Sequence, residues 1–178
     1  MAVLEIIHVP DPRLSTACRP MRPDELGPEF SAHLKDMAET MYAAPGVGLA
    51  APQVGDLRRY LVADPGFQDE EGKQRRGIDL IVMINPEIVE HSKETCRAEE
   101  GCLSVPDLWE DFVRPSWVVV RFLDEHGQRQ ERRFEGFPAT VVQHEMDHLD
   151  GVTILDKVSR FKRSRYLAAR RKARQRQE

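Results

Sequence analysis

The stretch Q-H-E-M-D-H-L-D-G, residues Gln143–Gly151, contains the pattern H-E-x-x-H. Two histidines four positions apart project from one face of a helix, where their imidazoles can bind one metal ion. Glu145 follows the first histidine, where its carboxylate can accept a proton from a metal-bound water. Pro138 suits the first turn of such a helix, and Gly151 suits its C-terminal end. The stretch therefore predicts a helix that carries a metal site.

A third metal ligand does not follow this helix. One group of zinc proteases has the longer pattern H-E-x-x-H-x-x-G-x-x-H, and this chain has Ile154 where the last histidine would stand. No histidine or cysteine occurs after His148. A third ligand must therefore come from the part of the chain that precedes the helix.

Cys102 has the most suggestive surroundings among the possible upstream ligands. Gly101 leaves room beside it, and the apolar Leu103 and Val105 can shelter a thiolate from water. The other upstream candidates are His8, Cys18, His33, His91, Cys96 and His126. These residues alone indicate a Cys-His-His site but leave open that Cys102 is a buried free cysteine.

Length and composition predict one ordinary globular domain. The 178 residues are 40% hydrophobic and 31% charged, and apolar runs such as Leu80–Ile84 are far too short to cross a membrane. The N-terminus lacks the pattern of a targeting peptide, and the three cysteines are too few for a disulfide framework. We therefore expect a cytoplasmic protein that does not contact a membrane.

The charge of the chain is unevenly distributed. Residues 157–178 contain ten Lys or Arg against one acidic residue, so residues 1–156 carry 16 basic and 29 acidic side chains. An acidic body with a basic C-terminal segment predicts an anionic partner for that segment alone.

Apolar spacing and turn residues predict the other elements. Gly27-Pro28 begins an amphipathic helix that ends near Ala44. Residues 1–23 read as a short strand or an extended arm with turns, and Ala, Arg, Lys and Leu favour a terminal helix from Ser159. The predicted strands are Arg58–Asp64, Ile78–Ile84, Glu87–His91 after a turn at Asn85-Pro86, and a hairpin of Val118–Leu123 and Gln130–Phe134; a polar loop, Pro65–Gly77, separates the first two.

Three motifs occur in a fixed order: G-V-G-L-A-A-P-Q at Gly46–Gln53, E-G-C-L-S-V at Glu100–Val105, and the stretch Gln143–Gly151. Together they resemble the three motifs of peptide deformylases, which remove the formyl group from nascent bacterial proteins. The E-G-C form is similar to the bacterial type-1 branch. The resemblance implies an α+β fold in which the metal-bearing helix packs between small, mostly antiparallel sheets, with a C-terminal helix. It implies a catalytic domain at residues 1–156 and a basic helix or tail at residues 157–178.

The resemblance also implies roles for single residues. The metal ligands would be Cys102, His144 and His148. Glu145 would be the general acid and base, while the side chain of Gln53 and the backbone N–H of Leu103 would stabilise the oxygen that becomes anionic. The residues near the substrate would be Val47, Gly48, Glu100 and Val141, of which Glu100 supports the site and the others lie near the methionine side chain.

The implied reaction is the hydrolysis of the formyl amide of an N-terminal formyl-methionine, which releases formate. One thiolate and two imidazoles suit Zn²⁺, Fe²⁺, Co²⁺ or Ni²⁺, and the resemblance implies Fe²⁺ in the cell. Two departures from the family concern the peptide beyond methionine. Asp107 stands where such chains often have glycine, and Leu108-Trp109-Glu110 occupy a region where some relatives have an arginine.

The basic C-terminal segment predicts attachment to the ribosome near the exit tunnel, where nascent chains emerge beside RNA phosphates. The resemblance points the same way, because type-1 enzymes are thought to use a C-terminal helix on the ribosome. The predicted contacts are Arg160, Arg163, Arg170, Arg171 and Arg174. None of these is needed by the chemistry, so we expect turnover of short peptides to be indifferent to residues 157–178.

Three other functions remain open from the residues. A metallopeptidase would use the same metal chemistry but would cut ordinary peptide bonds. A structural zinc module would need a fourth protein ligand and would give Glu145 no role. An RNA-binding protein would bind through residues 157–178 and would hydrolyse nothing.

Overall fold

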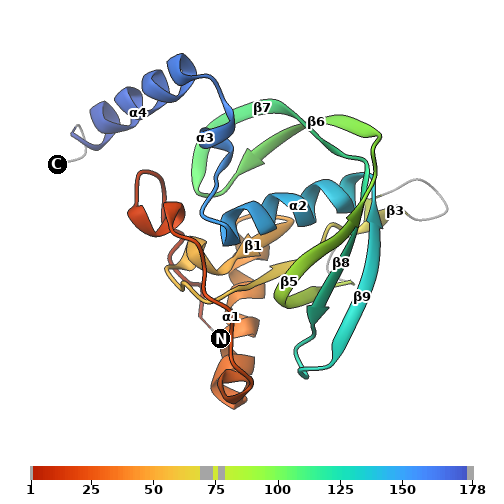
Figure 1. Ribbon diagram of the computed structural model, residues 1–178. Helices are drawn as coiled ribbons and strands as arrows, with labels where there is room; N and C mark the ends of the chain where they lie inside the picture. Colours follow the sequence, from red (N-terminus) through yellow and green to blue (C-terminus); the bar gives the residue numbers. More distant parts are fainter. Residues whose placement is uncertain (1, 69–73, 76–78, 176–178) are drawn as a thin grey trace.

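Antiparallel sheets and α-helices make up the computed structural model, which describes residues 2–68, 74–75 and 79–175 (Figure 1). The largest sheet has the strand order β1-β2-β5-β8-β9, in which β1 is Gly48–Ala50, and neighbouring strands in it are antiparallel. Two smaller sheets pair β3 with β4 and β6 with β7. The predicted α+β class is therefore confirmed. Among the described helices, none has the length and apolar character to cross a membrane.

Two helices cover the two faces of the five-stranded sheet. Strand β2 (Tyr60–Ala63) is fully buried, since Tyr60 and Val62 pack with α1 (Pro28–Ala43) while Leu61 and Ala63 pack with α2 (Phe137–Leu149). A strand that is buried on both faces reads as a continuous apolar run. The predicted helix at Gly27–Ala44 is confirmed. Its buried apolar side chains include Phe30, Leu34, Met37 and Met41.

Strand β5 (Ile81–His91) corrects the predicted turn at Asn85-Pro86, because the chain continues through both residues as one strand. Asn85 has a φ of 51°, and the register with β8 (Trp117–Leu123) shifts just after it. Its side chain accepts from the N–H of Met21 at 2.7 Å and donates to the Met21 carbonyl at 2.9 Å. An irregularity of this kind accommodates a proline inside a strand.

Other parts of the predicted strand pattern hold. The hairpin of β8 and β9 (Arg129–Glu135) is confirmed. The loop Pro65–Gly77 contains two short paired strands, β3 (Phe67–Gln68) and β4 (Gln74–Arg75). Residues 69–73 and 76–78 lie outside the described part. The predicted start of a strand at Ile78 falls among these residues.

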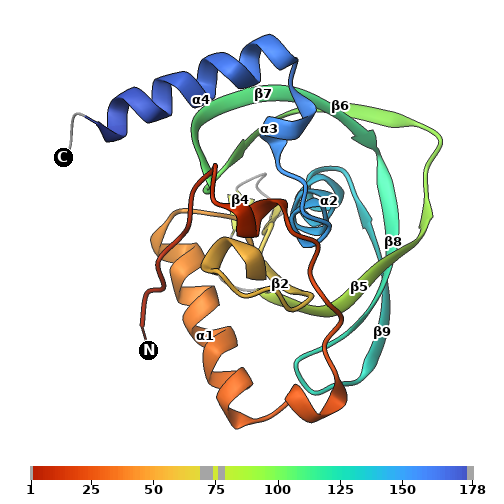
Figure 2. The same ribbon diagram turned by 60° about the vertical axis from the view of Figure 1, so that its left-hand side comes forward.

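A second hairpin was not predicted. It consists of β6 (Thr95–Cys102) and β7 (Val105–Pro115), and it curves around α2 on the side away from α1 (Figure 2). Both strands alternate between exposed and covered positions, and most of their exposed residues are polar. Strands that are rich in polar and charged residues give a weak sequence signal.

The N-terminal arm ties together the three motif segments. It runs extended through two short turns at Pro12–Ser15 and Pro23–Glu25, as predicted. The N–H of Ile7 donates to the Gln53 carbonyl at 2.8 Å, and that of Val9 donates to the Ser104 carbonyl at 3.0 Å. Further along, the N–H of Cys18 donates to the carbonyl of the helix residue Leu149 at 2.8 Å. The arm therefore fixes the loops on both sides of α2 relative to the helix.

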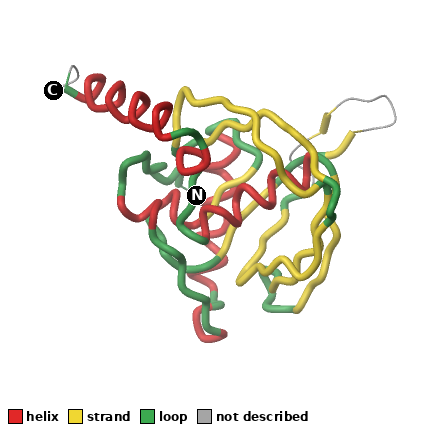
Figure 3. Tube along the Cα trace, turned by 45° about the horizontal axis from the view of Figure 1, so that its top comes forward, coloured by secondary structure: helices red, strands yellow, loops and turns green. Residues whose placement is uncertain are grey.

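Two helices follow α2. The predicted apolar segment Val152–Leu155 leads into the short α3 (Ile154–Lys157), and α4 (Arg160–Arg174) begins after Ser159, whose side chain caps its first turn. The predicted terminal helix is thus confirmed. The first half of α4 lies along β7, and its C-terminal half extends away from the body (Figures 1 and 3).

Candidate active site

Helix α2 carries the two histidines on one buried face. Its preceding residue, Gly136, has a φ of 64°, and Pro138 lies in the first turn. His144 is 8% exposed and His148 is 1% exposed, with their ring centroids 5.1 Å apart. Burial of two adjacent imidazoles in a protein core points to a shared partner between them.

Cys102, at the end of β6, completes a group of three ligand atoms. Its Sγ lies 3.2 Å from Nε2 of His148, and the ligand atoms of Cys102, His144 and His148 all lie within 4.8 Å of one another. One sulfur and two imidazole nitrogens are donors that suit a divalent transition metal. The hairpin thus brings the upstream cysteine to the helix, and the three residues fit a metal ion.

A carboxylate orients the first histidine. Oε2 of Glu100 lies 2.8 Å from Nδ1 of His144, which assigns the hydrogen to Nδ1 and leaves Nε2 for a metal. Burial raises the pKa of Glu100. Hydrogen bonds from Arg114 and His144 lower it by more, so the pKa falls to about 2. Burial also lowers the pKa of His144, whereas its bonds with Cys102 and Glu100 raise it, to about 10. Metal binding and protonation therefore compete at this group.

Arg114, on β7, holds this carboxylate in place. Its Nε and Nη2 donate to the two oxygens of Glu100 at 2.5 and 2.8 Å, and its Nη1 donates to Asp147 at 2.9 Å. The guanidinium is 6% exposed, and Lys157 pairs with the same oxygen of Asp147. Arg114 was not predicted from the sequence. Its place between Val113 and Pro115 gives no local sign of a buried ion pair, and sequence does not reveal its partners.

Glu145 lies beside the ligands with little room around it. A Cβ added to Gly48 would stand 2.6 Å from Cδ of Glu145, so only glycine fits opposite this carboxylate. Glu145 is 4% exposed, and its Oε2 is buried without a hydrogen-bond partner among the described residues. Burial raises the pKa of Glu145 to about 7. A carboxylate with such a pKa can accept and return a proton near neutral pH.

Gln53 and Leu103 are both neighbours of Cys102. The side-chain oxygen of Gln53 accepts from the N–H of Ala50 at 2.8 Å, which fixes the amide. Its Nε2 then lies 3.2 Å from Oγ of Ser104 and 3.8 Å from Sγ of Cys102. Leu103 occupies the turn between β6 and β7. The structure therefore brings an amide N–H of the first motif close to the cysteine of the second.

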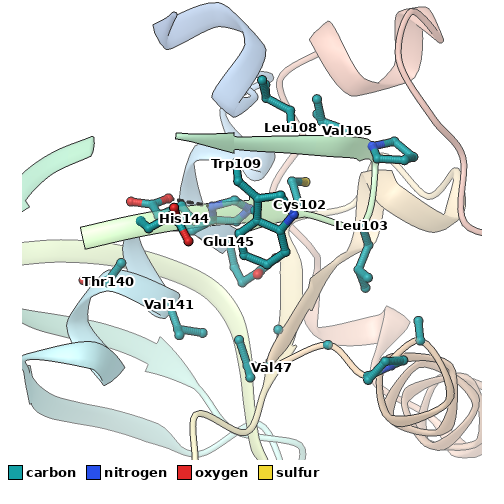
Figure 4. Close-up of a pocket in the computed structure, with 18 of the residues that line it drawn as sticks. Val47, Cys102, Leu103, Val105, Leu108, Trp109, Thr140, Val141, His144 and Glu145 are labelled. Atoms are coloured by element: carbon teal, nitrogen blue, oxygen red, sulfur yellow. Dashed lines mark hydrogen bonds and ion pairs between the residues drawn. The ribbon is translucent and has the colours of Figure 1, made fainter. Parts of the chain in front are cut away.

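A cavity of about 520 Å³ opens at this group of residues. Figure 4 shows Leu108 and Trp109 on one side of it and Val47 and Val141 on the other, with Glu145 between them. The predicted substrate residues Val47, Gly48, Glu100 and Val141 all line the cavity. The cavity is also lined by Leu108 and Trp109, which depart from the family pattern. Lining residues that were not predicted from the sequence include Pro45, Phe137 and Thr140.

Trp109 forms an exposed aromatic rim to this cavity. It pairs with Gly101 across the hairpin, and a Cβ on that glycine would lie 2.8 Å from the indole ring. The indole covers the glycine but is still 66% exposed. An exposed tryptophan of this kind offers apolar surface to a bound molecule.

Of the five predicted arginines of α4, the four whose side chains the structure describes do not line the cavity. Arg163 pairs with Asp156 at 2.5 Å, and Arg170 is half-buried, whereas Arg160 and Arg171 are exposed. The side chain of Arg174 lies outside the described part. The outward face of α4 also presents Phe161, which is 73% exposed, together with the exposed Arg165 and Lys172.

Comparisons with known proteins agree with this geometry. A family model described as polypeptide deformylase matches residues 3–164. A peptide deformylase of Rhizorhabdus wittichii is 45% identical over 98% of this chain and 97% of its own length. One of Erythrobacter litoralis is 41% identical over 98% and 99%. The crystal structure of a peptide deformylase from Ehrlichia chaffeensis in complex with actinonin superposes with a TM-score of 0.88, at 38% identity over 97% of this chain and 98% of that one.

Proposed function

This chain belongs to the polypeptide deformylase family, and we propose that its reaction takes place at the site formed by Cys102, His144 and His148. It is a metal-dependent amide hydrolase that removes the formyl group from the N-terminal formyl-methionine of nascent polypeptides. The single observation that supports this location best is the Cys-His-His group, in which Cys102 and His144 line the cavity and His148 is buried.

The bound metal is proposed to be Fe²⁺ in the cell, with Zn²⁺, Ni²⁺ or Co²⁺ in purified protein. The thiolate of Cys102 and the Nε2 atoms of His144 and His148 would hold it. When bound, the metal supplies Lewis acidity, which makes a water acidic enough to act as a nucleophile near neutral pH. Glu100 and Arg114 orient His144 for this task.

Glu145 is proposed to move the proton. Its buried carboxylate accepts the proton of the attacking water and then returns it to the departing α-amine. Support comes from its position against Gly48 and from the pKa of about 7 that its burial produces. Such a group contributes about 10²- to 10⁴-fold to the rate.

Gln53 and the backbone N–H of Leu103 are proposed to stabilise the formyl oxygen as it becomes anionic. Gln53 is held by its bond to Ala50, so its amide needs no reorganisation during the reaction. Removal of one such donor typically costs about 2.7–4 kcal/mol of transition-state stabilisation. Both donors lie beside Cys102, where the formyl group must lie to reach the metal.

The methionine side chain is proposed to enter the cavity between Val47 and Val141, with Gly48 also near it. Glu100 also lines the cavity, but its bonds to Arg114 and His144 favour a role in supporting the metal ligand. We expect formylated peptides to react much faster than acetylated ones, because the buried site is shaped for a formyl hydrogen and not for a methyl group.

The division of the chain at residue 156 is part of the proposal. Residues 1–156 contain every residue assigned to catalysis, and residues 157–178 would attach the enzyme to the ribosome near the exit tunnel, in the cytoplasm. The exposed cations Arg160, Arg165, Arg171 and Lys172 carry this attachment in preference to Arg163, which already pairs with Asp156. Phosphate contacts of this kind weaken as salt rises.

A formate-release assay on a formyl-methionyl tripeptide tests the proposed function. The protein is purified without oxygen, its metal content is measured, and actinonin, which the Ehrlichia chaffeensis enzyme binds, is added as an inhibitor. We expect formate release that requires one metal per chain and stops with actinonin. Cleavage of an internal peptide bond without formate release would show a metallopeptidase instead.

A further inference from the structure

One wall of the cavity is a segment of β7 that has no paired residues on β6. Residues Pro106–Leu108 line the cavity. The register pairs Val105 with Cys102 and Trp109 with Gly101, so these three residues bulge out between two adjacent positions of β6. The backbone groups of a bulge lose their ladder partners and need support from elsewhere.

Local preference does not stabilise this bulge either. Asp107, at its centre, has a φ of 65°, in the left-handed region that favours glycine. A non-glycine residue keeps this conformation only where its surroundings impose it. The shape of the wall must therefore come from contacts outside the hairpin.

Helix α4 makes these contacts from behind the wall. The hydroxyl of Tyr166 donates to the Pro106 carbonyl at 2.8 Å, so one of the bulge's backbone groups is bonded to the helix. The Tyr166 ring packs in the same apolar cluster as Leu108 and Cys102. One turn before Tyr166, Lys162 pairs with Glu110 at 2.6 Å and fixes the helix to the strand beyond the bulge.

Most of the catalytic groups are held independently of this contact. His144, Glu145 and His148 lie on α2, and Glu100 is fixed by Arg114 within the hairpin ladder. Cys102 shares the apolar cluster with Tyr166, but it is also paired with Val105 in the ladder. Loss of the bond from Tyr166 should therefore loosen the wall that surrounds the peptide while the metal and the proton-transfer group keep their positions.

We propose that Tyr166 is a positioning residue through which the C-terminal helix holds the cavity wall Pro106–Leu108 in its peptide-binding shape. The proposal rests on the proposed function, in which this cavity binds the formyl-methionyl peptide. It differs from the sequence-based expectation that turnover is indifferent to residues 157–178. The affinity for the peptide substrate, measured as KM, depends on the helix. The turnover of the bound substrate, measured as kcat, does not depend on it.

The test compares two variants that each lose one hydroxyl from α4. Tyr166→Phe keeps the packed ring but removes the donor to Pro106, whereas Ser164→Ala removes an exposed hydroxyl elsewhere on the helix. The measurements are kcat and KM on a formyl-methionyl tripeptide, metal content, and amide hydrogen exchange of residues 103–110.

For Tyr166→Phe we expect KM to rise about three- to tenfold, the effect of one lost hydrogen bond, with kcat and metal content unchanged. Exchange of residues 103–110 should become faster, and Ser164→Ala should match the wild type in every measurement. An unchanged KM and unchanged exchange in Tyr166→Phe would overturn the proposal, as would a fall in kcat at constant KM. Failure of the proposed function is a separate outcome, because the wild-type protein itself would then release no formate.

Discussion

At the scale of single residues, the site combines buried polar groups that a metal ion and a reacting water would satisfy. Glu145 is buried with one oxygen that lacks a partner among the described residues, and Gly48 closes against it. An unpaired buried carboxylate costs stability, so its presence points to a function. Cys102 and the two histidines share the same small volume.

The role of Glu145 predicts a separation of binding from chemistry. Glu145→Gln keeps the size of the side chain, so the fold and the bound metal should remain while formate release falls by about 10²- to 10⁴-fold. Steady-state assays and metal analysis on the same preparation check this. Glu131→Gln, an exposed change on β9, is the control and should behave as wild type. Near-normal turnover of Glu145→Gln would refute the proton-transfer assignment.

The two cysteines of β6 allow a matched comparison of metal ligation. Cys102→Ala should lose most of the bound metal, because it removes one of three protein ligands. Cys96→Ala, six residues earlier on the same strand, should retain the metal. Metal content after dialysis against a weak chelator distinguishes them. Equal retention by both variants would exclude Cys102 as a ligand.

At the scale of elements, the site depends on contacts between segments that are distant in sequence. Arg114 links β7 to the catalytic helix through Glu100 and Asp147, and the N-terminal arm bonds to all three motif segments. These contacts explain how the segments that carry Gln53 and Cys102 are held in place beside α2.

Replacement of Arg114 should affect both stability and metal affinity. Arg114→Met removes the guanidinium that pairs with the buried carboxylate of Glu100, and such a loss typically costs about 3–5 kcal/mol. His144 also loses its orientation, so metal affinity should fall by about 10- to 100-fold. Arg121→Met breaks an exposed pair with Glu131 and should cost less than about 1 kcal/mol. Denaturant unfolding and metal competition test both effects, and similar losses in the two variants would contradict the account.

The arm predicts a stability effect at a distance from the chemistry. Leu14 is fully buried in the cluster that joins the arm to β7 and α3. Leu14→Ala should therefore cost about 2–5 kcal/mol of unfolding free energy, whereas the exposed Val3→Ala should be nearly neutral. Thermal unfolding monitored by circular dichroism measures the difference. A small shift in Leu14→Ala would mean that the arm detaches without cost.

At the scale of the whole molecule, charge separates the acidic body from the basic C-terminal segment. The far half of α4 extends from the body (Figure 3), and its cations Arg171 and Lys172 are exposed. Such a geometry leaves a cationic surface available while the near half of the helix contacts the cavity wall.

This separation predicts the effect of truncation on ribosome binding. Removal of residues 157–178 should leave kcat on short peptides unchanged but weaken co-sedimentation with ribosomes, more strongly at low salt. The paired charge reversal Arg165→Glu with Lys172→Glu, on the outward face, should have the same effect on sedimentation without the rise in KM that loss of Tyr166 produces. Unchanged sedimentation of the truncated protein across low to moderate salt would refute ribosome attachment through this helix.

Local sequence determined the elements whose residue spacing and residue types indicate the same structure. Spacing alone predicted helix α2 with His144 and His148 on one face, because four residues make about one helical turn. Apolar spacing also predicted α1, and turn residues predicted the β8–β9 hairpin. The order of the three motifs indicated the family, to which the chain belongs.

Tertiary structure alone decided the contacts between those parts. The polar β6–β7 hairpin has too weak a pattern to be read, yet it carries Cys102 to the helix and provides Arg114. The turn predicted at Asn85 became a strand irregularity because its side chain bonds to Met21. Tyr166 reaches Pro106 across 60 positions of sequence. Such pairings depend on which surfaces meet in the folded chain, and no local preference encodes them.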